Sequence, residues 1–121
     1  MKILIIDDNT DITDAIKFYC ESKNTDYQIA NNASEGLAAI NNDKFDLVLL
    51  DIAMPEFTGL DVLNNLKSSG LLDKLNIVVF TASSDAKMFE EIKRNGVKEI
   101  LKKPCSVEEL EQVFSRYRKS F

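Results

Sequence analysis

The centre of this chain is the stretch FDLVLLDIAMP at residues 45–55. Its four apolar residues, 47–50, form an unbroken run without the alternation of a half-exposed strand. A short run of this kind, followed by the turn signals Pro55 and Gly59, predicts a strand buried on both faces, although periodicity alone leaves a helical segment open. Asp51 is the first charge after the run, so we expect it at the carboxyl end of that strand. Ligands of open α/β sheets bind beyond such strand ends.

The rest of the chain repeats this pattern of strand, turn and helix. Further strands are expected at residues 2–6, 27–30, 76–81 and 99–101. Five helices are expected between and after these strands. The first begins at Thr10, the second covers residues 34–42, and the third runs through Leu60 and Leu66 toward Gly70. The fourth contains Met88 and ends at Asn95-Gly96, and the fifth begins at the capping box of Ser106 and Glu109. This alternation predicts an α/β fold, a doubly wound five-stranded parallel sheet with helices on both faces. We expect a single domain over residues 1–121 with no output domain, since the last helix runs almost to the final residue.

The composition excludes several classes of function. The 121 residues carry a formal net charge of −5, which argues against nucleic-acid binding. Histidine is absent, which excludes Ser-His-Asp and Cys-His catalysis and imidazole metal sites, but not hard cations bound by oxygen atoms. With no apolar run of membrane-spanning length and no signal peptide, we expect a cytoplasmic protein without membrane contact. Cys20 and Cys105 lack metal-ligand spacing and are expected to be free thiols.

Polar residues stand at four predicted strand ends: Asp7 and Asp8 after the first, Asp51 after the third, Thr81 at the end of the fourth and Lys103 after the fifth. If strands one, three and four are neighbours, three carboxylates meet at one edge, where their repulsion requires a bound proton or a cation. Mg²⁺ is the natural cation for such ligands together with a substrate phosphate. Lysine and threonine can hold other phosphoryl oxygens, and an aspartate can itself accept the phosphoryl group. Asp51, which follows the most buried strand, is the best candidate for that acceptor.

Each of these residues also has an ordinary structural explanation. An acidic pair before a helix commonly serves as a cap, a threonine at a strand end satisfies a turn, and a lysine before proline is commonly a solvated surface charge. Asp51 alone fits a plain turn residue equally well. Their occurrence together, each at a strand end of one five-unit α/β chain, favours a functional site.

Four motifs resemble those of the response-regulator receiver domains of two-component signalling: Asp7-Asp8, Asp51-x-x-Met54-Pro55-x-x-x-Gly59, Thr81-Ala82 and Lys103-Pro104. The resemblance covers essentially the whole chain and is to the stand-alone, CheY-like members. It implies the flavodoxin-like (βα)5 fold with strand order 2-1-3-4-5 and a cis peptide bond before Pro104. It also implies a signalling module rather than an enzyme.

The resemblance implies a magnesium-dependent phosphoacceptor. Asp51 would accept a phosphoryl group from a phosphohistidine on a partner. Asp8, Asp51 and the backbone carbonyl of Ala53 would be ligands of Mg²⁺, with Asp7 acting mostly through a bound water. Because the chain has no histidine, the donor must be a separate sensor histidine kinase or histidine-phosphotransfer protein.

Two further motif residues would handle the phosphoryl group and the signal. Lys103 would hold a phosphoryl oxygen, and Thr81 would move toward the phosphate and so switch a surface that binds a downstream protein target. We expect a monomer or a phosphorylation-dependent dimer.

The chain departs from the family pattern at two positions. The tyrosine or phenylalanine that the family commonly has three residues before the lysine is Ile100 here, and Cys105 stands where phenylalanine is common. The usual aromatic readout of phosphorylation is therefore not expected. Ala53 and Ser83 would flank the path of the water that hydrolyses the acyl phosphate, and both are too small to block it and neither can activate it as a base.

Three other interpretations remain open. A phosphatase of the haloacid-dehalogenase type also uses an aspartyl nucleophile, and Asp7-Asp8-Asn9-Thr10 resembles its motif, although Asn9 replaces the second acid and the chain is short for a cap domain. A flavodoxin-like FMN binder shares the fold, but the acidic pair would repel the FMN phosphate. The third is a receiver-like adaptor that works without phosphorylation, although no active-site residue is missing.

Overall fold

The computed structural model describes residues 1–54, 58–82 and 85–118, so Pro55 and Ser83 lie outside the described residues. Its elements follow the order β1 (Lys2–Ile6), α1 (Thr10–Ser22), β2 (Asp26–Ala30), α2 (Ala33–Asn42), β3 (Leu47–Leu50), α3 (Gly59–Ser68), the 3₁₀ helix η1 (Leu72–Lys74), β4 (Ile77–Thr81), α4 (Ala86–Arg94), β5 (Glu99–Lys102) and α5 (Val107–Tyr117). The predicted strands and helices are confirmed, with ends that differ by one or two residues. The 3₁₀ helix is an addition that the sequence pattern did not predict.

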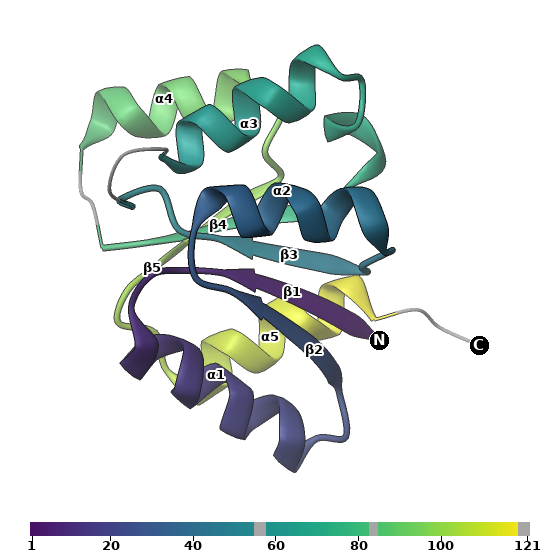
Figure 1. Ribbon diagram of the computed structural model, residues 1–121. Helices are drawn as coiled ribbons and strands as arrows, with labels where there is room; N and C mark the ends of the chain where they lie inside the picture. The colour runs from purple at the N-terminus through teal and green to yellow at the C-terminus, as the bar shows by residue number, and fades with distance from the viewer. Residues whose placement is uncertain (55–57, 83–84, 119–121) are drawn as a thin grey trace.

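The five strands form one parallel sheet in the order β2-β1-β3-β4-β5. Helices α1 and α5 cover one face of the sheet, and α2, α3 and α4 cover the other (Figure 1). This is the doubly wound, flavodoxin-like arrangement that we expected. Because all strands point the same way, the carboxyl ends of the adjacent strands β1, β3 and β4 open onto one edge of the sheet.

Strand β3 explains why its apolar run is unbroken. Successive side chains of a strand point to opposite faces of the sheet. Leu47 and Leu49 belong to the core under α1 and α5, whereas Val48 and Leu50 belong to the core under α2, α3 and α4. All four residues are at most 1% exposed. The strand is therefore buried on both faces, and Asp51 is the first position at which the chain can carry a charge.

Side-chain caps set where the helices begin, at Asn9, Asn32, Thr58, Asp85 and Ser106, and only the last was predicted from the sequence. Ser106 and Glu109 form the predicted capping box of α5. Thr58 and Asp61 form a second box that starts α3 at Gly59. Gly59 packs closely on the chain that follows β3, since a Cβ added there would lie 2.3 Å from the carbonyl oxygen of Asp51. Over the described ranges, no helix is both long enough and apolar enough to cross a bilayer.

Candidate phosphoryl-transfer site

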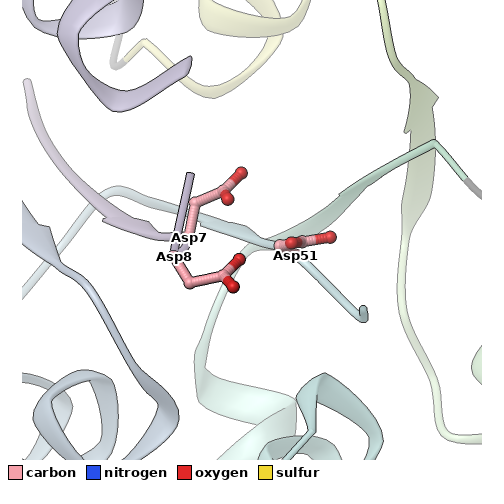
Figure 2. A group of neighbouring side chains, drawn as sticks. All are labelled: Asp7, Asp8 and Asp51. Carbon is pink, nitrogen blue, oxygen red and sulfur yellow. The ribbon is translucent and has the colours of Figure 1, made fainter. Parts of the chain in front are cut away.

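Three aspartates meet at the carboxyl edge of the sheet (Figure 2). Asp7 and Asp8 follow β1, Asp51 follows the neighbouring β3, and carboxylate oxygens of the three lie within 4.8 Å of one another. Hydrogen bonds of the backbone extend the sheet into this edge. The Asp7 N–H donates to the carbonyl of Ala30 at 3.0 Å, and the Asp51 N–H donates to the carbonyl of Ile6 at 2.9 Å. The carboxylates that the sequence places at two strand ends thus share one small volume.

The three carboxylates differ in their surroundings. Asp7 is buried, and each of its oxygens already accepts a hydrogen bond. Oδ1 accepts from the N–H of Asn9 at 2.9 Å, and Oδ2 accepts from the ammonium of Lys103 at 2.6 Å. Asp8 is exposed to solvent, while Asp51 is buried. The cluster therefore combines two carboxylates shielded by the protein with one that an incoming ion can reach.

The Asp51 carboxylate is surrounded by opposing influences. Burial and then the negative charge of Asp7 raise the pKa of Asp51 above its ordinary value. The charge of Lys103, 3.6 Å from Oδ2, and the N–H of Ala53, which donates to Oδ1 at 3.2 Å, act in the opposite direction. The raising influences, which include a smaller one from Asp8, prevail, so the pKa of Asp51 lies above its ordinary value. A cation placed among these oxygens would relieve the repulsion that raises the pKa.

Lys103 is held at the site from two directions. It directly follows β5, and its N–H donates to the carbonyl of Thr81 at 2.9 Å. Its side chain is only 10% exposed, and its ammonium pairs with Asp7 and Asp51. The ordinary structural explanation, that Lys103 is a solvated surface charge, is therefore wrong. The peptide bond from Lys103 to Pro104 is cis, as the resemblance implies.

The other residues singled out in the sequence do not belong to the carboxylate cluster. Thr81 is fully buried and ends β4, next to the strand that leads into Asp51. Ile100 is partly buried against the core under α2, α3 and α4, on a neighbouring strand. Cys105 is half-buried and Cys20 is buried, and both are free thiols as expected.

The donor set fits a hard divalent cation. All three side chains of the cluster offer carboxylate oxygens, and none offers nitrogen or sulfur. Two oxygens bound to the same Mg²⁺ lie at most about 4.2 Å apart, so carboxylates already within 4.8 Å need little movement to share one ion. Asp8 and Asp51 are better placed as direct ligands than Asp7, because both oxygens of Asp7 accept hydrogen bonds, whereas Asp8 is exposed and one oxygen of Asp51 accepts from Ala53.

One neighbour of the site was missed in the sequence. The ring of Phe80, on β4, lies against the ammonium of Lys103, with 5.1 Å between Nζ and the ring centroid. In the sequence Phe80 is only the last apolar residue of a buried strand, and no local motif marks it. Its contact depends on the pairing of β4 with β5, which local patterns do not encode.

Comparison with known proteins agrees with this architecture. The family model of the response regulator receiver domain matches residues 3–115, and the chain therefore belongs to that family. The response regulator MprA of Mycobacterium avium is 31% identical over 110 residues, which are 91% of this chain and 47% of that protein, so the chain spans about half of its length.

Two solved structures are similar over nearly the whole chain. A CheY-like receiver domain protein from Methanospirillum hungatei is 30% identical with a TM-score of 0.86, covering 96% of this chain and 92% of that one. The response regulator TrrA from Thermotoga maritima, solved in complex with Mg²⁺ and BeF, is 25% identical with a TM-score of 0.83, covering 97% and 98%. Receiver domains are signalling modules, and membership implies interaction with a histidine kinase or a phosphotransfer partner.

Proposed function

We propose that this chain is the phosphoacceptor of a two-component phosphorelay and that Asp51 receives the phosphoryl group. The observation that carries the proposal is the position of the Asp51 carboxylate. It is buried at the carboxyl edge of the sheet, 3.6 Å from the Lys103 ammonium and within 4.8 Å of oxygens of Asp7 and Asp8. A nucleophile, a cation for the phosphoryl oxygens and an oxygen-only metal site thus coincide.

The transfer itself needs few groups. A carboxylate oxygen of Asp51 forms a bond to phosphorus while the P–N bond of the phosphohistidine breaks, and the imidazole nitrogen leaves with the electron pair. Phosphoryl transfer is catalysed mainly by positioning and by charge stabilisation. Lys103 supplies one fixed positive charge for the phosphoryl oxygens. Mg²⁺, held by Asp8, Asp51 and the carbonyl of Ala53, would neutralise the remaining charge. The similar TrrA was solved in complex with Mg²⁺ and BeF, which supports an ion at this site.

Asp7 has a supporting role in this scheme. Its Oδ2 holds the ammonium of Lys103 and its Oδ1 is fixed by the N–H of Asn9. In this scheme it orients Lys103 and would meet a bound Mg²⁺ only through a water. The same arrangement disfavours a phosphatase in which Asp7 is the nucleophile, because the attacking oxygen would first have to leave one of these hydrogen bonds.

The signal leaves the site through Thr81 and its surroundings. A new phosphoryl group stabilises the active state only through contacts that differ between the two states, here with Thr81 and Lys103. Ile100 is β-branched and stiff about χ1, so it cannot make the inward swing of an aromatic ring. We expect Thr81→Ala to keep phosphorylation but reduce the amide-resonance shifts that follow it, and Ile100→Ala to change those shifts only slightly. Shifts that survive the first change but vanish in the second would contradict this route.

The decisive experiment for the acceptor is intact-mass analysis after incubation with Mg²⁺ and acetyl phosphate. The parent chain should gain one phosphoryl group, and Asp51→Asn should gain none. Asp73→Asn, an exposed aspartate on η1, is the matched control and should behave as the parent. Loss of the adduct in Asp7→Asn together with its retention in Asp51→Asn would favour the phosphatase. Absence of any adduct on the parent would favour the adaptor.

A further inference from the structure

Phe80 gives the Lys103 ammonium a third neighbour. The ammonium lies 2.6 Å from Oδ2 of Asp7, 3.6 Å from Oδ2 of Asp51 and 5.1 Å from the centroid of the Phe80 ring. A lysine ammonium within about 6 Å of a ring centroid is attracted by the negative face of the ring, and the attraction grows when the pair is desolvated. This pair is desolvated, since the lysine side chain is 10% exposed and Phe80 is 5% exposed.

The Phe80 ring is fixed in place by its neighbours, whereas the Lys103 side chain has many rotamers. Phe80 belongs to the core between the sheet and helices α1 and α5, where Ile16 and Leu110 are also buried, so its ring is held by packing. Lys103 carries its charge on a four-carbon stem that can adopt many rotamers. Its backbone is anchored to Thr81, the residue that directly follows Phe80. The backbone hydrogen bond thus brings the lysine to the neighbourhood of the ring.

The ammonium has more than one carboxylate within reach. It is closer to Asp7 than to Asp51, and the solvent-exposed Asp8 offers a third carboxylate in the same cluster. The ion pair with Asp7 alone does not fix the distance of the ammonium from Asp51, because the lysine stem has several rotatable bonds. A ring on one side removes part of that freedom without competing for the hydrogen bonds of the ammonium.

We propose that Phe80 is a positioning residue that keeps the ammonium of Lys103 within reach of both Asp7 and Asp51. The ring does not touch the phosphoryl group, and it acts only through the lysine. This inference rests on the proposed function, because the benefit of the positioning is a cation already in place when Asp51 receives its phosphoryl group.

The test compares three variants of the full chain. Phe80→Leu removes the aromatic face but keeps an apolar side chain, Phe80→Tyr keeps the face, and Phe114→Leu makes the same truncation in the same core cluster. The initial rate of phosphorylation by acetyl phosphate is measured by intact mass, and Mg²⁺ affinity by NMR titration. Phe80→Leu should lower the rate about tenfold and leave Mg²⁺ affinity within about twofold, while Phe80→Tyr and Phe114→Leu keep the parental rate.

A second measurement reports the contact without any chemistry. The Hε protons of Lys103, assigned with Lys103→Arg, should resonate upfield in the parent because of the ring current, and should lose this shift in Phe80→Leu but not in Phe80→Tyr. A parental rate in Phe80→Leu, an equal loss in Phe80→Tyr, or no upfield shift in the parent would each overturn the proposal. If the parent accepts no phosphoryl group, the proposed function fails, and the proton shift still decides whether the ring holds the lysine.

Discussion

Replacing Asp51 by asparagine should raise the free energy of unfolding at neutral pH, although it removes the proposed acceptor. Asparagine has nearly the same shape, and its carbonyl oxygen can still accept the N–H of Ala53 that now donates at 3.2 Å. What is removed is a negative charge that is buried beside two other carboxylates. The substitution therefore separates the energetic cost of the charge from the packing of the side chain.

The distances set the size of the effect. With an effective dielectric constant of about 20, the repulsion from Asp7, whose oxygen lies within 4.8 Å, is at least about 3.5 kcal/mol, and the attraction to Lys103 at 3.6 Å is about 5 kcal/mol. Asp8 is exposed, so solvent reduces its repulsion to about 1 kcal/mol. These terms nearly cancel, and the cost of burying the charge remains. We expect a net stabilisation on the order of 1–2 kcal/mol. Each kcal/mol corresponds to an increase in Tm of roughly 3–6 °C for a domain of this size.

The dependence of stability on pH tests a second time whether Asp51→Asn is more stable than the parent. The pKa of Asp51 is raised in the folded state, so its protonated form contributes stability that is present below the unfolded-state pKa, about 3.9, and is lost as the pH rises through the folded pKa. The advantage of Asp51→Asn should thus be full at neutral pH and should shrink on acidification.

Urea unfolding followed by circular dichroism in metal-free buffer measures this difference. Asp73→Asn removes the same charge from an exposed position and should change stability by less than about 0.5 kcal/mol. Added Mg²⁺ should stabilise the parent by mass action and Asp51→Asn much less. The reasoning is refuted if Asp51→Asn unfolds at the same or a lower urea concentration than the parent at neutral pH, or if Asp73→Asn stabilises the chain equally.

Three further outcomes are expected. Gly59→Ala should lower the free energy of unfolding by about 1–3 kcal/mol in urea, because its Cβ would meet the backbone that follows β3 at 2.3 Å, and that backbone must shift. Asp8→Asn should weaken Mg²⁺ binding more than Asp7→Asn does, because both oxygens of Asp7 already accept hydrogen bonds. The increase in Tm on adding Mg²⁺ measures the binding of each variant. Burial raises the pKa of Cys20 to about 11, so iodoacetamide at neutral pH should modify the less buried Cys105 first, as peptide mapping by mass spectrometry would show.

Local patterns in the sequence are enough to locate the strands and the residues that follow them. An apolar run such as residues 47–50 is recognisable because burial on both faces leaves no position for a polar side chain. The Ser106 capping box and the Asn95-Gly96 helix end are likewise local, since their partners lie within a few residues. The capping box at Thr58 and Asp61 is equally local. It was missed because its acidic partner is aspartate, whereas glutamate or glutamine is usual at that position.

The site depends on contacts that no local pattern contains. Lys103 reaches Asp7 across 96 positions of the chain, and this ion pair exists only because β1, β3, β4 and β5 lie side by side in one parallel sheet. In the sequence that order came from a family resemblance, not from periodicity. Periodicity tells which residues are buried but not which strand is adjacent.

The same limit explains Phe80 and Gly59. Phe80 fits its strand pattern without any sign of a special role, and Gly59 is marked only as a turn signal and a motif residue, not as a point of close contact. The ring of Phe80 meets Lys103 through the pairing of β4 with β5, and Gly59 allows α3 to approach the carbonyl oxygen of Asp51. The identity of the charged groups is a property of the sequence. Their distances, and hence the raised pKa of Asp51 and the capacity of the cluster to hold a cation, arise when the parallel pairing of the strands brings the strand ends to one edge.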